Sequence, residues 1–169
     1  MATYIVLLRA VNVGGTGKLP MSELRDLCRA CGFLQVQTYI ASGNVVLQAD
    51  GDEAEVRTGL AAALQAHVGK PVGLVVRNAA EMAGVLAANP YAAHPPNLVH
   101  VIFLDEPCSP AHLDGVTGAA SEEIALGRRE IYVHYPQGQG ASKLKIPAAK
   151  TGTARNINTV ARLAELAAL

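Results

Sequence analysis

The sequence has few large aromatic residues and no excess of charge of either sign. Its 169 residues include no tryptophan, two phenylalanines and five tyrosines. Fourteen basic residues balance fourteen acidic ones, and the sequence pI is near 7.0. Proteins that bind nucleic acid generally carry a basic surface and often stack bases on aromatic rings. The composition therefore disfavours nucleic acid as a partner and leaves room only for local electrostatic recognition.

The chain also has no uninterrupted apolar run of membrane-spanning length. Its longest uncharged stretch, residues 82–104, is interrupted by Asn89-Pro90 and Pro95-Pro96, whereas a spanning helix needs about 20 consecutive apolar residues. Residues 1–8 have no basic segment ahead of an apolar one, as a secretory signal would. We therefore expect a soluble, cytoplasmic protein with no membrane partner.

Cysteine is scarce as well, with three residues in the chain. Cys28 and Cys31 form a C-x-x-C pair, but they lie in a stretch of helical periodicity, no second pair follows, and the five histidines are dispersed along the sequence. A structural zinc site needs four ligands at recognisable spacing. We therefore expect both cysteines to pack in a core, and we expect neither a metal site nor a cofactor.

The residues that are present form a regular succession of strand and helix patterns. In the first half, short aliphatic and β-branched runs predict strands at 3–8, 36–40, 44–48 and 72–77. Helical periodicity predicts helices at 20–31 and 52–68. The order β-α-β-β-α-β is that of the ferredoxin-like split βαβ, in which an antiparallel strand lies between two parallel ones. We therefore expect an α+β fold whose first subdomain, residues 1–77, is ferredoxin-like.

The second half repeats part of this order. The pattern predicts a helix at 79–88, a strand at 98–104, a helix at 109–119, and a hairpin of strands at 121–126 and 130–135. A Gly-rich loop and an amphipathic last helix follow, with no strand predicted between them. We expect residues 78–169 to form a related but incomplete α+β subdomain that ends in a C-terminal helix. A single mixed sheet shared by both halves is the alternative.

A glycine-rich loop, Asn12-Val-Gly14-Gly15-Thr-Gly-Lys18, joins the first predicted strand to the first helix. Glycines allow backbone N–H groups to approach an anion, and the start of a helix adds positive potential. The loop matches neither phosphate-binding fingerprint, because Asn12 and Leu19 break the P-loop pattern and Pro20 replaces the third glycine of the dinucleotide motif. An anion contact and a plain tight turn both remain open.

The predicted topology brings a second donor-rich turn, Ser42-Gly43-Asn44, close to this loop. In a split βαβ the first two strands run the same way, so the loop after the first strand and the hairpin after the second lie at one edge of the sheet. Because both segments are polar, the edge is our candidate ligand site. Its predicted residues are Arg9, Asn12, Gly14, Gly15, Lys18, Ser42, Gly43 and Asn44.

A second candidate cluster lies near the C-terminus, where residues 128–169 contain seven basic and two acidic residues. Lys143 ends a flexible loop, and Arg155 and Asn156 stand at the predicted start of the last helix. Arg155 would share a helical face with Asn158, Thr159 and Arg162 by 3–4 spacing. This face is either a ligand contact or an ordinary solvated surface.

Several segments together resemble one family, the domain of unknown function 1697. They are Leu7-Leu8-Arg9-Ala-Val-Asn12-Val-Gly14-Gly15, Lys18-Leu-Pro20-Met21, Thr38-Tyr-Ile-Ala-Ser42-Gly43-Asn44-Val-Val, Asn89-Pro90, His134-Tyr135-Pro136, Ser142-Lys143-Leu and Thr153-Ala-Arg155-Asn156-Ile-Asn158-Thr159-Val. The resemblance spans essentially the whole chain. It implies an α+β bacterial cytoplasmic protein of two related subdomains, and it implies no established activity, cofactor or catalytic residue.

The sequence departs from the family pattern at four positions. The family commonly has Gly at position 10, Gln at 41 and Arg at 141, and many members have Trp at 157, whereas this chain has Ala10, Ala41, Ala141 and Ile157. The missing Arg and Trp weaken any strong anion clamp or stacking contact at the second cluster.

Three classes of function follow from these patterns. The leading one is binding of a small phosphate- or carboxylate-bearing ligand at the glycine-loop edge. The second is a phosphate-ester or acyl-phosphate hydrolase, by analogy with acylphosphatases, with Arg9 and Asn44 holding phosphate. Against it, the acylphosphatase loop motif is absent from the sequence. The third is a protein-interaction or dimerisation module with an exposed sheet edge. The sequence leaves the oligomeric state open.

Overall fold

The computed structural model describes residues 1–9 and 19–169. By compactness the chain forms two units, a first unit of residues 1–82 with 163–169 and a second unit of residues 83–162. The predicted domains, 1–77 and 78–169, differ from these units in assigning the whole last helix to the second half. That the chain folds as these two domains stays a prediction.

The first unit contains a four-stranded sheet of strand order β2-β3-β1-β4, and every pair of neighbours is antiparallel. Its strands are β1 (Ala2–Leu8), β2 (Leu34–Thr38), β3 (Asn44–Ala49) and β4 (Leu74–Asn78). Helix α1 (Met21–Ala30) connects β1 to β2, and α2 (Glu53–Val68) connects β3 to β4. The predicted succession of elements is confirmed, and β3 lies between β1 and β2, which therefore run in the same direction.

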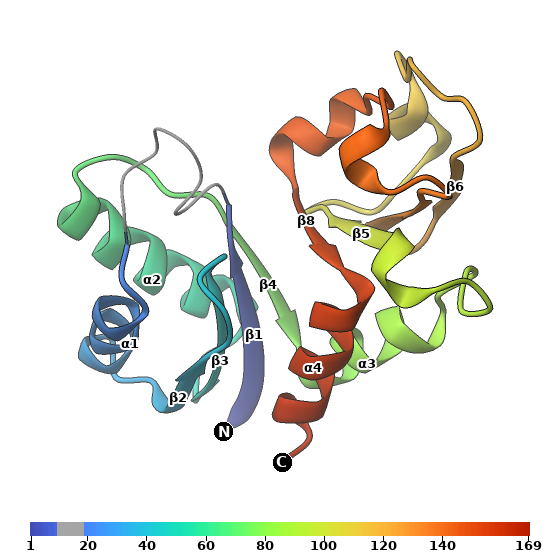
Figure 1. The fold of residues 1–169 in the computed structure, drawn as a ribbon. Helices are drawn as coiled ribbons and strands as arrows, with labels where there is room; N and C mark the ends of the chain where they lie inside the picture. The colour runs from blue at the N-terminus through green and yellow to red at the C-terminus, as the bar shows by residue number, and fades with distance from the viewer. Residues whose placement is uncertain (10–18) are drawn as a thin grey trace. The chain divides into compact units, whose positions relative to one another are not determined.

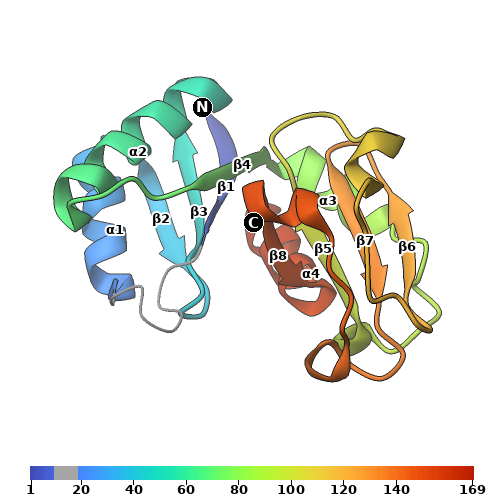
Figure 2. The same cartoon turned by 90° about the horizontal axis from the view of Figure 1, so that it is seen from above.

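Helices α1 and α2 cover one face of this sheet (Figure 1, Figure 2). Alternate residues of β1 (Tyr4, Val6 and Leu8) face the helices, as the two-residue period of a strand requires. They pack with Leu24 and Cys28 of α1, and with Val56, Leu60 and Leu64 of α2, which recur at four-residue spacing on one helical stripe. Cys28 is fully buried, so its predicted place in the core is confirmed. The same prediction is wrong for Cys31, which follows α1 and is only half-buried.

The second unit has a sheet of the same plan, with strand order β6-β7-β5-β8 and antiparallel neighbours (Figure 2). Its strands are β5 (Val99–Phe103), β6 (Glu123–Leu126), β7 (Glu130–His134) and β8 (Thr153–Asn156). The expectation that this half is incomplete is therefore wrong. The chain forms two separate four-stranded sheets, which also excludes a single shared sheet.

The predicted helix at 109–119 is also wrong, because only a short 3-10 turn, Pro110–Leu113, forms there. Gly115 and Gly118 both adopt positive φ values of 75°, and a continuing α-helix cannot pass through such conformations. Two further 3-10 turns follow, Gln139–Ala141 and Pro147–Thr151. Residues of the loops around these turns, including Val116, Leu144 and Ala149, pack on Ile102, Ile131 and Val133 of the second sheet.

Helix α3 (Ala79–Ala87) precedes the second sheet, and a 3-10 turn at Pro96–Leu98 leads into it; α4 (Ile157–Ala167) follows β8. The buried Tyr132 hydroxyl of β7 donates to the Val85 carbonyl of α3 at 2.7 Å. Among the described residues, no helix is both long enough and apolar enough to cross a membrane.

Candidate functional site

The end of β1 lies between two connecting segments of the first unit. The Leu8 amide donates to the Gly43 carbonyl at 2.8 Å, and the Arg9 amide donates to the Gly73 carbonyl at 2.9 Å. Leu7 is paired with Asn44 and Leu8 with Leu74. Arg9, Ser42, Gly43 and Asn44 therefore lie at one edge of the sheet, the edge at which β1 ends and β3 and β4 begin. The other predicted members, Asn12, Gly14, Gly15 and Lys18, lie outside the described residues.

Asn44 organises the β2–β3 turn. Its side chain is fully buried, and its Nδ2 donates to the Tyr39 carbonyl and to Ser42 Oγ, both at 2.9 Å. Gly43 adopts a φ of 88°, which a residue with a side chain reaches only with strain. The amide of Asn44 is thus engaged inside the turn, and its predicted contact with a ligand stays a prediction.

Three arginines reach this edge from different elements. Arg9 is exposed, and its stem lies across Gly73, where a Cβ would stand only 3.2 Å from the Arg9 Cβ. Arg25 of α1 donates to Thr38 Oγ1, at the end of β2, at 2.7 Å. Arg57 of α2 donates to the Leu74 carbonyl, at the start of β4, at 2.8 Å. No sequence motif indicates Arg25 and Arg57, because only the fold brings them to the end of β1.

The second predicted cluster is built differently from the expectation. Arg155 belongs to β8, so the proposed helical face that it would share with Asn158 is wrong. Its guanidinium is buried and donates to Thr153 Oγ1 at 2.6 Å and to the Ala154 carbonyl at 2.9 Å. Burial lowers the pKa of Arg155 to about 10, still far above neutral pH, so the group is cationic.

The two neighbouring members of this cluster differ in how they are held. Asn156 donates to the Asn97 carbonyl at 3.2 Å, and its Oδ1 accepts from the Asn158 amide at 2.8 Å, in the first turn of α4. Lys143 is exposed on its loop. A ligand role for Lys143, Arg155 and Asn156 stays a prediction.

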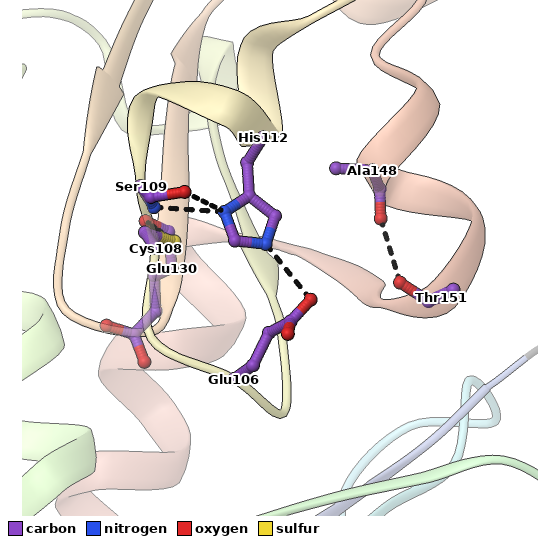
Figure 3. A network of polar contacts seen from close by, with 7 residues as sticks. All are labelled: Glu106, Cys108, Ser109, His112, Glu130, Ala148 and Thr151. Carbon is purple, nitrogen blue, oxygen red and sulfur yellow. Dashed lines mark hydrogen bonds and ion pairs between the residues drawn. The ribbon is translucent and has the colours of Figure 1, made fainter.

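One loop of the second unit brings a serine, a histidine and a glutamate together (Figure 3). His112 Nδ1 lies 3.4 Å from Ser109 Oγ, and its Nε2 lies 3.1 Å from Glu106 Oε1. However, the Ser109 backbone amide also donates to Nδ1, at 2.9 Å. Because this contact occupies the Nδ1 lone pair, the nitrogen is not available to accept a proton from the Ser109 hydroxyl. The arrangement caps a turn and is not a nucleophile–base pair.

A second histidine cluster lies at the open end of the β6–β7 hairpin. Glu123 and His134 are directly opposite one another in register, with Glu123 Oε1 3.2 Å from His134 Nδ1. His94, on the turn after α3, places its Nε2 3.9 Å from the same oxygen. The two imidazole rings stack with centroids 3.8 Å apart. The fold therefore brings together two histidines that are distant from one another in the sequence.

Tyr91 and an open cavity border this cluster. The Tyr91 ring centroid is 5.8 Å from that of His134, and burial, together with the negative charge of Glu123, raises the pKa of the Tyr91 hydroxyl. A cavity of about 340 Å³ has His94 in its wall, with Leu86, Asn89 and Asn158 among its other lining residues. The predicted hairpin places Glu123 and His134 on neighbouring strands without giving their register, and the position of His94 depends on tertiary structure.

The fold defines a class of α+β proteins with two four-stranded antiparallel sheets, and a solved structure shares it. The conserved bacterial protein SP0830 from Streptococcus pneumoniae is 21% identical in sequence, with a TM-score of 0.83 and a match that covers 98% of each chain. No curated protein matches the sequence. The family model described as "Protein of unknown function (DUF1697)" matches residues 1–132. The chain belongs to this family, as its motifs indicate.

Proposed function

We propose that this protein binds a small phosphate- or carboxylate-bearing ligand at the edge of the first sheet where β1 ends. One observation carries the proposal: Arg9, Arg25 and Arg57 reach this edge from three different elements, and two of them are fixed by hydrogen bonds to neighbouring strands. Guanidinium groups bind oxyanions well because their donors form a planar fork that matches two oxygens at once.

The start of α1 supports the same ligand chemistry. The helix begins after Pro20, and no side chain in the described part of the chain caps it, so its first amides present positive potential. The carboxylate of Glu23, the acidic residue of that first turn, lies 3.0 Å from His67 Nε2. Lys18 and the glycines before it join the proposed site on sequence grounds alone.

We also infer that both units follow a ferredoxin-like plan and that the protein works in the bacterial cytoplasm. The matching strand orders, β2-β3-β1-β4 and β6-β7-β5-β8, support the first inference. On this plan the second unit keeps the strands but replaces the two long helices with 3-10 turns and loops.

Calorimetric titration with inorganic phosphate and with succinate tests the proposal. Arg9→Ala should weaken the binding of at least one of the two by roughly tenfold, because a charge-assisted hydrogen bond contributes about 1.5 kcal/mol or more. Arg29→Ala is the matched control, since Arg29 is an exposed arginine in the last turn of α1 and pairs only weakly, at 3.4 Å, with Asp26. It should leave affinity unchanged.

Two results would count against the proposal. One is the absence of saturable binding of either anion, which would favour the interaction-module alternative. The other is an equal loss of affinity in Arg9→Ala and Arg29→Ala, which would indicate general attraction to the protein's charge and not a site.

A further inference from the structure

We propose that His94, Glu123 and His134 form a binding site for a divalent transition-metal ion, of which zinc is the simplest probe. The site lies wholly in the second unit, and it does not depend on the anion site of the first unit. Each of the three residues offers one ligand atom, and these atoms all lie within 4.8 Å of one another. Two imidazoles and one carboxylate are a ligand set that suits zinc and iron.

The strand pairing fixes two of the three ligands. Glu123 and His134 occupy opposed positions on β6 and β7, and their side chains already touch at 3.2 Å. His134 is 4% exposed, so its ring is held by its surroundings. Ligand atoms around a tetrahedral zinc stand roughly 3.4 Å apart, because each lies about 2.0–2.2 Å from the metal. The Glu123–His134 distance needs almost no change.

His94 is the ligand that must adjust. Its ring lies within 19° of parallel to that of His134, whereas a metal lies in the plane of each imidazole that binds it. The His94 ring must therefore turn out of the stack. Its side chain is 42% exposed and stands on a turn, so the rotation meets little packing. The distance from His94 Nε2 to Glu123 Oε1, now 3.9 Å, must then shorten for both atoms to bind the same ion.

Three protein ligands leave at least one coordination position of the metal open. His94 also lines the cavity of about 340 Å³, with Leu86, Asn89 and Asn158 among its other walls. An ion at this site would carry water or an oxygen-donor ligand such as a carboxylate into that cavity. The ligand set is thus that of an exchangeable or catalytic metal site, in contrast to a closed four-ligand structural site.

Titration of chelator-treated protein with zinc, in competition with a chromogenic chelator, tests the proposal. The protein should bind one zinc ion per chain. His94→Ala and Glu123→Gln should each weaken zinc binding by at least about tenfold, because loss of even an outer-shell partner costs about 10- to 100-fold. Both side chains are partly exposed, so these variants should keep the fold, which circular dichroism of the metal-free proteins checks.

His67→Ala is the matched control. This variant removes another histidine–glutamate pair, in which His67 Nε2 lies 3.0 Å from Glu23 Oε2. Among the described residues, no second histidine joins that pair. The variant should therefore leave zinc binding unchanged. The proposal is overturned if the wild-type protein shows no saturable zinc binding, or if His94→Ala and Glu123→Gln bind zinc as tightly as the wild type.

Discussion

Single residues of this protein show that burial sets what a polar group can do. Arg9 and Arg155 carry the same guanidinium, yet Arg9 is exposed at the end of a strand while Arg155 is buried and held by Thr153. Sequence alone gave both the same interpretation, as anion contacts. Arg155 lies in a strand of only four residues. So short a strand shows no sequence pattern that would distinguish its buried arginine from an exposed one such as Arg9.

Two buried side chains that lose a proton at high pH, the Cys28 thiol and the Tyr132 hydroxyl, predict a loss of stability at alkaline pH. Burial raises the pKa of the Cys28 thiol from 9.0 to about 12, and burial with the nearby Glu130 charge raises that of Tyr132 from 10.0 to about 12. The folded state therefore holds both protons more tightly than the unfolded state. Their contribution to the free energy of unfolding is fully present below pH 9. It is lost as the pH rises toward 12, because the unfolded state gives up these protons first. The loss is about 1.4 kcal/mol for each unit by which folding raises the pKa of a group.

Urea unfolding as a function of pH checks this expectation, with Tyr132→Phe as the informative variant. At pH 7 the variant should lose about 1 kcal/mol, because the hydrogen bond from the hydroxyl to the Val85 carbonyl is gone. Its stability should then fall less steeply than that of the wild type above pH 10. Identical slopes for the two proteins would contradict the account of Tyr132.

At the scale of elements, long periodic segments were predicted well and short polar ones were not. Helix α2 was predicted at 52–68 and spans Glu53–Val68, with Asp52 Oδ1 accepting from the Glu55 amide at its start. Strand β8 was missed because Thr-Ala-Arg-Asn has no apolar alternation, and it forms only because β5 offers an edge to pair with. Tertiary pairing overrode local preference there.

A glycine just before β8 makes this pairing testable. A Cβ at Gly152 would lie 2.4 Å from the Phe103 carbonyl oxygen and 2.8 Å from Leu104 Cδ2. Gly152→Ala should therefore destabilise the protein by about 1–3 kcal/mol, as overpacking does. Gly140→Ala is the control, since no described residue beyond its chain neighbours lies within 4 Å of its Cβ position, and it should stay within about 0.5 kcal/mol of the wild type.

Urea denaturation of both glycine variants gives the answer directly. If Gly152→Ala is as stable as Gly140→Ala, the close approach of Gly152 to the end of β5 is not a feature of the folded protein.

For the molecule as a whole, the sequence predicted two related halves and an α+β fold, and it underestimated how alike their sheets are. The full repeat was missed because the four residues of β8 show no apolar alternation, and the helix predicted at 109–119 is a short 3-10 turn at Pro110–Leu113 in the structure. The convergence of Arg9 with the Ser42–Asn44 turn followed from topology and could be predicted. Arg25, Arg57 and the pairing of His94 with His134 depend on side chains that meet only in the folded chain.

Backbone amide NMR during a phosphate titration decides whether the end of β1 forms an anion site. An anion site there predicts saturable shifts at Arg9, at the turn residues Ser42 and Gly43, at Gly73, and in the segment from Asn12 to Lys18. It is contradicted if these amides stay still while others move.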